Sequence, residues 1–355
     1  MQSNNTKKLK KGRGAQFNVH NPFEKNQIVQ EHWEGLDLDT EKEAPHRTVY
    51  QEVFPKSIVN KVDSPDIPMN WSMNPYQGCE HGCIYCYARN THTYWGYSSG
   101  TEFENVILVK KNAPDLLAQK LKSRFWKGES IMLSGNTDCY QPAEKKLEIT
   151  RKCLEVFLKF KNPVGIITKN DLLLRDMDIL KELAQLRLVS VAVSITTLNE
   201  DLRRAMEPRT STGQRRVEMV AKLSEAGIKV GVLMAPVIPY LNHEEIPDLV
   251  KAVSEAGAAN IYHLMVRLNN QNGALFQDWV KRHFPERSEK VVNQIRALHE
   301  GNLNDSTFGQ RMRGVGHEAD AISKLMKLSK KKYFTPKAFY QLRKERIRPK
   351  QLGLF

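Results

Sequence analysis

The stretch Cys79-Glu80-His81-Gly82-Cys83-Ile84-Tyr85-Cys86 carries three cysteines in the spacing C-x3-C-x2-C. A thiolate at each position can bind one iron of a four-iron cluster, and the short spacing lets a single tight loop reach three corners of it. The fourth iron is then open to a second ligand, which can accept an electron there. The stretch therefore makes Cys79, Cys83 and Cys86 candidate ligands of a [4Fe-4S] cluster.

A structural zinc site is the alternative explanation of this stretch. His81 or His92 could supply the fourth ligand that a closed tetrahedral zinc site requires. However, no second Cys or His pair follows at a finger-like interval, and Cys139 and Cys153 stand alone further along the chain. A disulfide framework is a poor explanation because the cysteines number only 5 in 355 residues.

Composition limits the class of protein. A chain of 355 residues can bury a sizeable core, as one large α/β domain with tails or as two domains. The first residues are polar and basic, and no apolar run approaches the ~20 residues that span a bilayer. We therefore expect a cytoplasmic protein with no membrane partner, in a compartment that keeps thiols reduced.

The net charge of +14 belongs to the two ends of the chain. Residues 1–13 contain five Lys and Arg and no acid, and residues 324–350 contain eleven against a single Glu. The part between them is then close to neutral. Basic ends are a common electrostatic footprint of a partner with a phosphate backbone, although they can also be merely solvated. The charge thus favours nucleic acid as a partner.

Beyond residue 70 the chain alternates two kinds of apolar pattern. Continuous apolar runs, typical of buried parallel strands, predict strands over 71–77, 130–134, 164–168, 188–195, 228–237 and 261–267. Apolar residues at i, i+3, i+4 spacing predict helices over 114–126, 145–160, 172–185, 213–226 and 244–256. Six strand-helix units predict an α/β fold, a partial (β/α)6 TIM-like barrel, with a doubly wound open sheet as the competing architecture.

The ends of the predicted strands carry polar or unusual residues, as a site at the carboxyl rim of a parallel sheet requires. The cysteine loop follows the first strand, and Thr137 and Asp138 follow the second. Lys169 follows the third strand, and Ser194 lies at the end of the fourth. Any one of them could be an ordinary strand-to-helix cap. Together, opposite the cysteine loop, they favour a functional site.

With its flanking aromatics the cysteine run resembles the signature of radical S-adenosylmethionine (SAM) enzymes. Over residues 64–267 the chain resembles the spore photoproduct lyase-like branch, and Asn74-Pro75-Tyr76-Gln77-Gly78 resembles a bacterial subfamily of it without an established reaction. The resemblance implies a [4Fe-4S] cluster with SAM on its open iron. Reduction by a donor such as a flavodoxin or ferredoxin would then cleave SAM to methionine and a 5'-deoxyadenosyl radical, which abstracts hydrogen from a substrate.

The resemblance also assigns residues in and directly after the cysteine loop. Cys79, Cys83 and Cys86 would be the cluster ligands. Tyr85 and Tyr87 match catalytic-site aromatics beside the adenosyl group.

Further positions match residues that contact SAM. Thr137 and Asp138 match a polar pair near SAM, and Lys169 would meet the methionine carboxylate, which suits a flexible point charge. Ser194 would face the ribose. Arg209 is a candidate for a second carboxylate contact, with an exposed loop arginine as the alternative.

The fifth strand would contribute to adenine binding. Ala235 and Pro236 would line the adenine through their backbones.

One departure from the branch concerns the return of hydrogen to the substrate. The photoproduct lyases carry a cysteine at the end of strand two that serves this purpose, and this chain has Gly135 at that position. Cys139 lies four residues further on and is a candidate substitute, with a semi-buried structural cysteine as the alternative. The departure puts repair of the spore thymine dimer in doubt.

We expect four regions along the chain: a polar and basic arm over 1–63, the barrel over 64–270, a helical extension over 271–334 and a basic tail over 335–355. The extension includes a glycine-bounded basic loop over 308–314. Thr335-Pro336 predicts the start of a helix over 337–346. Its interleaved aromatics and cations suit base stacking and phosphate binding, although the aromatics could instead pack on the barrel.

The last five residues, Gln351-Leu352-Gly353-Leu354-Phe355, resemble the pentapeptide by which bacterial polymerases and repair proteins bind the DNA sliding clamp. Leu352, Leu354 and Phe355 would fill an apolar groove while Gln351 fixes the register by hydrogen bonding. Docking onto the protein's own surface is the alternative.

These features together predict a radical SAM enzyme that acts on DNA, by lesion repair or base modification, and is recruited by the sliding clamp. Two alternatives remain open at this level: modification of RNA or a peptide by the same chemistry, and a non-catalytic zinc-containing DNA-binding adaptor. The sequence identifies neither the lesion, the hydrogen donor nor the physiological reductant. It is equally silent on whether SAM is regenerated and on the oligomeric state.

Overall fold

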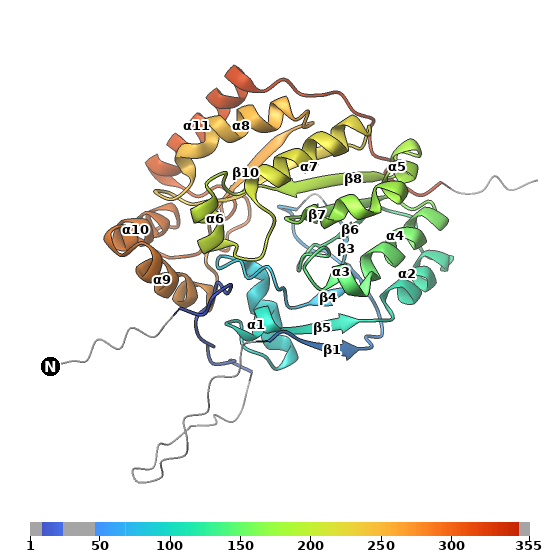
Figure 1. Cartoon of the computed structure of the whole chain (residues 1–355), viewed down its shortest axis with the longest axis horizontal. Coiled ribbons are helices and arrows are strands. Elements are labelled where there is room, and N and C mark those ends of the chain that lie inside the picture. Colours follow the sequence, from blue (N-terminus) through green and yellow to red (C-terminus); the bar gives the residue numbers. More distant parts are fainter. Residues whose placement is uncertain (1–8, 24–46, 68, 348–355) are drawn as a thin grey trace, which may run out of the picture.

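The computed structural model describes residues 9–23, 47–67 and 69–347 (Figure 1). Its largest sheet has seven strands in the order β10-β9-β8-β7-β6-β3-β2. All pair in parallel except β2, which is antiparallel to β3 at one edge. The strands are β2 Val59–Lys61, β3 Trp71–Met73, β6 Ile131–Leu133, β7 Val164–Thr168, β8 Val189–Ser194, β9 Val230–Val237 and β10 Ile261–Met265.

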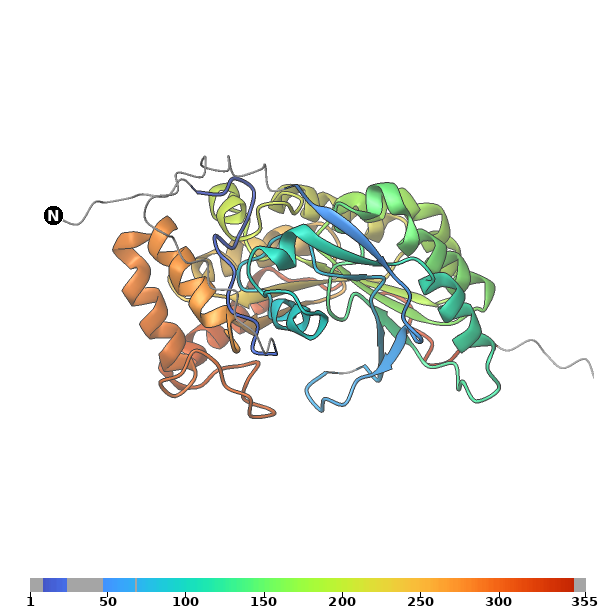
Figure 2. The ribbon, with the colours of Figure 1, turned by 90° about the horizontal axis from the view of Figure 1, so that it is seen from below.

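This strand order confirms the partial (β/α)6 barrel. The six parallel strands follow one another in space as they do in sequence, without the reversal that a doubly wound sheet requires. Five helices therefore lie on one side of the sheet, the upper side in Figure 2. They are α2 Ala113–Lys122, α4 Ile149–Lys159, α5 Met177–Gln185, α7 Gly213–Glu225 and α8 Ile246–Glu255.

The main core lies between this sheet and its helices. In β8 the side chains of Val189, Val191 and Val193 are buried in this core, whereas Ser190 and Ala192 are only half-buried on the other face. Alternate residues of a strand point to opposite faces of a sheet, so the face away from the helices is partly open to solvent. We call this the concave face.

A second, smaller sheet lies beside the cysteine loop and was not predicted. It has the order β1-β5-β4, formed by β1 Val49–Val53, β5 Val106–Lys110 and β4 Tyr76–Gln77. The strand predicted over 71–77 is thus divided between two sheets. Strands β1 and β2 both lie in the range expected to be a polar arm, because short exposed strands carry little apolar pattern.

Short helices occupy the loops around the carboxyl rim of the large sheet. They are η1 Tyr87–Trp95, α1 Glu102–Asn105, α3 Glu144–Leu147, η2 Asp171–Asp176, α6 Glu200–Met206 and η3 His243–Glu245. The C-terminal helices are α9 Asn272–His283, η4 Pro285–Arg287, α10 Ser288–Leu298 and α11 Gly316–Tyr333. No helix in the described part of the chain is long and apolar enough to cross a membrane.

The helix predicted over 337–346 is wrong, because this segment is extended. It runs across the amino ends of the barrel strands, where Arg343 N donates to Arg187 O at 2.9 Å and Arg346 N donates to Gly128 O at 2.7 Å. The Tyr340 hydroxyl donates to Val189 O at 2.5 Å. The backbone of this segment thus forms hydrogen bonds with residues at the strand starts and not with its own helical turns. Its aromatic side chains pack on the barrel. The clamp-like pentapeptide lies outside the described residues.

Candidate functional site

The three cysteines lie together on the loop between β4 and η1. Cys79 and Cys83 are 6% exposed, Cys86 is half-buried, and all three are free thiols. The three interact electrostatically with one another, and burial raises the pKa of the Cys79 and Cys83 thiols well above the ordinary value. Neighbouring buried thiols lose their protons when metal cations bind them, because the cations compensate the charge of the thiolates. This donor set therefore fits an iron-sulfur cluster.

The candidate fourth ligands of a zinc site are engaged elsewhere. His81 Nδ1 lies 3.4 Å from Asp138 Oδ2, and the His92 ring stacks on Tyr97 with its centroid 5.1 Å away. Within residues 9–23, 47–67 and 69–347, no three His, Cys, Asp or Glu side chains are grouped so as to share one metal ion. The two histidines therefore contact protein groups other than the three cysteines.

Arg89 fixes the backbone of the cysteine loop from inside the protein. Its Nε donates to Cys83 O at 2.9 Å and its Nη2 donates to Gly82 O at 3.1 Å. Nη2 also forms an ion pair with Glu104 at 2.5 Å, and both side chains are fully buried. On the other side of the loop, Asn272 Nδ2 donates to Cys86 O at 2.9 Å. The loop is thus held in place by protein groups.

The N-terminal segment completes this support. The Glu104 carboxylate accepts from Gly14 N at 3.0 Å and from Ala15 N at 2.8 Å, while Arg13 Nη1 donates to the Glu104 carbonyl at 2.7 Å. The two segments touch so closely that a Cβ built on Gly14 would lie 2.0 Å from Gly82 O. Only glycine fits at position 14 without a shift of the cysteine loop.

Asp138 joins the cysteine loop to the ends of β6 and β7. Its carboxylate accepts from Thr168 Oγ1 and from Lys169 N, both at 2.8 Å, and it faces His81. Burial alone would raise the pKa of Asp138, but His81 and the hydrogen bonds from the Lys169 and Tyr140 amides hold it below its ordinary value. Its neighbour Thr137 is buried and donates to a backbone carbonyl of β4. Both residues therefore position the rim.

Lys169 presents a cation to this site. Its ammonium lies 5.9 Å from the centroid of the Tyr85 ring, and within the described residues it has no hydrogen bond or ion pair. Burial lowers the pKa of Lys169, but the neighbouring Cys83 and Glu207 raise it by more, so the pKa lies above its ordinary value. A protonated lysine with free donors can bind an anionic ligand such as a carboxylate.

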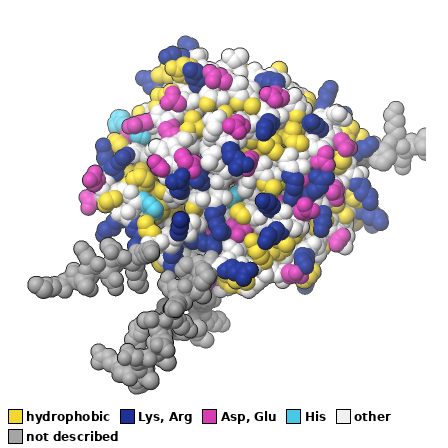
Figure 3. Space-filling view, in the orientation of Figure 1, with side chains coloured by type: hydrophobic (Ala, Val, Ile, Leu, Met, Phe, Trp, Pro, Cys, Tyr) yellow, Lys and Arg dark blue, Asp and Glu magenta, His cyan; other side chains and the backbone are white. Residues whose placement is uncertain are grey.

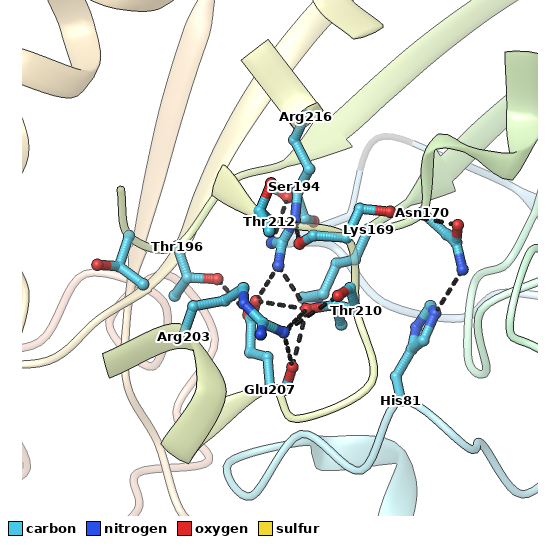
Figure 4. A network of polar contacts seen from close by, with 12 residues as sticks. His81, Lys169, Asn170, Ser194, Thr196, Arg203, Glu207, Thr210, Thr212 and Arg216 are labelled. Atoms are coloured by element: carbon cyan, nitrogen blue, oxygen red, sulfur yellow. Dashed lines mark hydrogen bonds and ion pairs between the residues drawn. The ribbon is translucent and has the colours of Figure 1, made fainter. Parts of the chain in front are cut away.

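A buried network that the sequence did not reveal surrounds Lys169 (Figure 4). Glu207 and Arg216 are fully buried and form an ion pair at 2.5 Å. Glu207 also accepts hydrogen bonds from the hydroxyls of Tyr85 and Thr196. Arg216 and its hydrogen bonds hold the pKa of Glu207 down, at about 2, against the effect of burial. The carboxylate therefore stays ionised and fixes the Tyr85 ring beside the cysteines.

The last two strand ends are tied into the same rim. Arg216 Nη1 donates to Ser194 O at 3.0 Å, which links the end of β8 to the network. Asn242 Nδ2 donates to Pro236 O at 3.0 Å and to Thr196 O at 2.8 Å. Ala235 and Pro236, at the end of β9, are half-buried and joined by a cis peptide bond. The structure thus brings the ends of β6, β7, β8 and β9 together around the cysteine loop.

Two predicted site residues lie elsewhere. Arg209 forms an ion pair with Glu80 at 3.2 Å and is 37% exposed, on the outer side of the cysteine loop. Cys139 is fully buried in the main core, where burial raises the pKa of its thiol well above the ordinary value. Cys139 is thus a core residue, as its alternative interpretation held. By contrast, Tyr87 is 47% exposed and its hydroxyl donates to Gly135 O at 2.6 Å, across the mouth of the barrel.

Known proteins match this chain in sequence and in fold. The model of the radical SAM superfamily matches residues 73–253. An uncharacterized protein of Mycobacterium tuberculosis is 34% identical over 253 residues, which cover 70% of this chain and 73% of that protein. An uncharacterized protein of Methanocaldococcus jannaschii is 29% identical over 222 residues, which cover 62% of this chain and 79% of that protein.

A solved structure of spore photoproduct lyase complexed with dinucleoside spore photoproduct superposes with a TM-score of 0.59 at 15% identity. The match covers 84% of this chain and 83% of that chain, and at this identity it shows the shared fold. A double mutant of the same lyase with bound AdoMet and dinucleoside spore photoproduct gives a TM-score of 0.58. The chain therefore belongs to the radical SAM superfamily, whose enzymes use a [4Fe-4S] cluster and SAM, and is an enzyme of spore photoproduct lyase-like fold.

Proposed function

We propose that this radical SAM enzyme acts on DNA, by repairing a lesion or modifying a base. The observation that carries the proposal is the open concave face beside the cysteine loop. Its strands present half-buried side chains there, the small Ser190, Ala192 and Gly231 together with the larger Met132, Ile167 and Leu233. This face is thus partly exposed next to the rim where Lys169 and Tyr85 lie, which suits a substrate that approaches the rim from that side.

Charge and fold also support a nucleic-acid substrate. The face seen in Figure 3 mixes cations and anions, so the body shows no single-sign field on that side. The excess of +14 is carried by residues near both ends, which suits contact with a phosphate backbone. The lyase that shares this fold over 84% of the chain is solved with a dinucleoside photoproduct.

The chain's own residues have distinct tasks in this account. When bound and reduced, the cluster with SAM supplies a carbon radical that abstracts hydrogen from the substrate. Cys79, Cys83 and Cys86 would hold the cluster, and Lys169 would bind the SAM carboxylate. Tyr87 is exposed at the mouth and is a candidate substrate contact.

The remaining rim residues position these groups. Glu207 accepts from Tyr85 and thereby holds its ring beside the cysteines. Ser194, Ala235 and Pro236 end their strands where ribose and adenine would lie. Cys139 is too deeply buried to return hydrogen to a product radical, so that hydrogen would come from another source.

The test of the substrate is a comparison of nucleic acids in one assay. Anaerobically reconstituted protein, SAM and dithionite would be incubated with oligonucleotides that carry defined base lesions, and both 5'-deoxyadenosine and the oligonucleotide mass would be measured. We expect damaged DNA to stimulate 5'-deoxyadenosine release and to change in mass. Stimulation by tRNA or a peptide, with no response to any DNA, would contradict the proposal and favour the alternative substrates.

We further propose that Gln351, Leu352, Leu354 and Phe355 bind the bacterial DNA sliding clamp, and that a flavodoxin or ferredoxin supplies the electron. The full chain and a chain lacking residues 351–355 would be compared for clamp affinity by surface plasmon resonance. The truncation should abolish clamp binding and leave SAM cleavage unchanged. Equal affinity of the two chains would rule out this docking mode.

A further inference from the structure

A loop over residues 307–314, which we call the seam loop, bridges the open side of the barrel between β10 and the β2–β3 edge. Its Met312 O accepts from Met265 N of β10 at 3.0 Å. On the other side, Arg311 Nε donates to Asp66 at 2.5 Å and Arg311 Nη2 donates to Ser64 Oγ at 2.6 Å. Figure 2 shows the seam loop approaching the loop between β2 and β3, which carries Ser64 and Asp66, below the sheet. The seam loop is therefore fixed at the entrance to the concave face.

Arg267 brings a second cation to this entrance. It follows the carboxyl end of β10, two residues beyond the Met265 amide that binds the seam loop. Arg267 is half-buried, and its guanidinium has no hydrogen bond or ion pair within the described residues. It interacts electrostatically with Arg311, Tyr87 and Asp66, and burial followed by Arg311 lowers its pKa.

The charges at the entrance do not cancel. Two arginines face one carboxylate, and Asp66 is already bound by Arg311 and by Gly309 N at 2.8 Å. Arg267 thus remains a partly desolvated cation without a compensating anion among the described residues. A phosphate group would offer the planar guanidinium a bidentate partner.

An aromatic side chain lies beside this cation. Phe308 is 55% exposed, and the Arg311 guanidinium lies 4.5 Å from the centroid of its ring. The backbone of the loop is already ordered, since Arg311 N donates to Thr307 O and Gly314 N donates to Gln310 O, both at 3.0 Å. Proteins bind single-stranded nucleic acids through exposed aromatic side chains that stack on the bases and through neighbouring cations that bind the backbone. A base can stack on Phe308 only if it is free of its own duplex neighbours.

We propose that Arg267, Arg311 and Phe308 form a contact site for a single-stranded segment of DNA at the seam, with a phosphate on Arg267 and a base on Phe308. This inference rests on the proposed function, because it assigns the DNA substrate a place on the protein. Tyr87, which follows the cluster ligand Cys86 directly, is electrostatically coupled to Arg267. A nucleotide bound at the seam would therefore lie on the side of the barrel where Tyr87 is exposed.

The test measures binding of a short fluorescent oligothymidylate to the cluster-loaded enzyme by anisotropy, over a series of salt concentrations. Arg267→Ala should weaken binding about tenfold. It should also make the fall of log affinity with log salt less steep by about 0.7, the contribution of one phosphate contact. Phe308→Ala should weaken binding about 5- to 150-fold with an unchanged slope, because stacking releases no counterions. Arg267→Lys should keep the slope.

The chain offers a matched control pair. Arg124 lies 4.8 Å from the ring of the exposed Phe125, in the loop before β6 at the opposite end of the barrel. Arg124→Ala and Phe125→Ala should bind the oligonucleotide as the wild type does. Losses as large as those of the seam variants would show nonspecific attraction and overturn the inference.

The outcomes separate this inference from the proposed function. Wild-type binding that is unchanged in Arg267→Ala and Phe308→Ala overturns the seam site alone. A wild-type enzyme that binds no DNA overturns both. Iron content and circular dichroism check folding, and if Arg267→Ala fails to fold, the exposed Phe308→Ala decides the question.

Discussion

Arg89 and Glu104 form a fully buried ion pair, with 2.5 Å between Nη2 and Oε1, that joins the cysteine loop to the N-terminal segment. Arg89 donates to the carbonyls of Gly82 and Cys83, while Glu104 accepts from the amide of Gly14. Both side chains are shielded from water, so the two opposite charges compensate each other inside the protein. The pair therefore fixes the loop in the geometry that its thiols need.

Glu104→Gln should destabilise the fold strongly. It leaves Arg89 as a buried charge without its ion-pair partner, and breaking such a pair costs about 3–5 kcal/mol. The free energy of unfolding, measured by guanidinium denaturation, should fall by this amount, and the iron content after reconstitution should fall with it.

A matched control is the exposed pair of Arg282 and Asp278 on α9, at 2.8 Å. Asp278→Asn should cost less than about 1 kcal/mol, because surface pairs are screened by water. If Glu104→Gln cost no more than this control, the buried pair would not be the support of the loop.

Gly14→Ala should disturb the cysteine loop by sterics alone. Its Cβ would overlap Gly82 O, and overpacking of this kind costs about 1–3 kcal/mol. Gly231→Ala is the control, because a Cβ there would meet its nearest atom at 3.6 Å, an ordinary contact. Thermal unfolding and iron content of the two variants measure the difference. Equal values for both would contradict the close packing of the arm on the loop.

The barrel could be predicted from the sequence because buried parallel strands leave a strong signal. The run predicted over 164–168 coincides with β7, and the other inner strands agree within a few residues. Strand β1 could not be found, because four of its five residues are exposed and show no alternation. The segment over 337–346 has a valid helix start, but its backbone pairs with the strand ends, a tertiary effect that local pattern does not contain.

The sequence predicts those site residues whose role follows from their spacing along the chain. It does not predict those whose role follows from burial in the folded protein. The three cysteines were predicted from their spacing and Lys169 from its place after a strand, and the structure brings these four residues to the same rim. Glu207 and Arg216 were missed, since charged residues in a loop look like surface residues until the fold buries them. For Cys139 the sequence left a catalytic and a structural role open, because a position after a strand does not show which way the side chain points.

Lys169→Met should weaken SAM binding by about 2 kcal/mol, the usual contribution of a hydrogen bond to a charged group. Equilibrium dialysis of SAM against cluster-loaded protein measures the affinity. Lys251→Met, at an exposed position on α8, is the control and should leave the affinity unchanged. Equal affinity in the Lys169 variant would remove this lysine from the SAM site.

His92 should make stability depend on pH. Burial lowers the pKa of His92 to about 4, whereas an unfolded histidine titrates near 6.5. Between these values the unfolded chain binds more protons, so stability is lost as the pH falls below about 6.5. The free energy of unfolding should drop by about 2 kcal/mol between pH 7 and pH 5.

The matched variant is His92→Phe, which keeps an aromatic ring against Tyr97 and removes the titration. The difference in unfolding free energy between this variant and the wild type should change by the same amount over that pH range. A difference independent of pH would show that His92 does not carry this dependence.

The central claim is that Cys79, Cys83 and Cys86 hold a cluster that cleaves SAM. The most direct measurement is anaerobic reconstitution with iron and sulfide, reduction with dithionite in the presence of SAM, and mass-spectrometric detection of 5'-deoxyadenosine. The product should form in the wild type and in Cys153→Ala, whose thiol is buried in the core, and should vanish in each single alanine variant of the three loop cysteines. A Cys83→Ala variant that still assembles the full cluster and forms the product, or a wild type that binds zinc and no iron, would contradict the account.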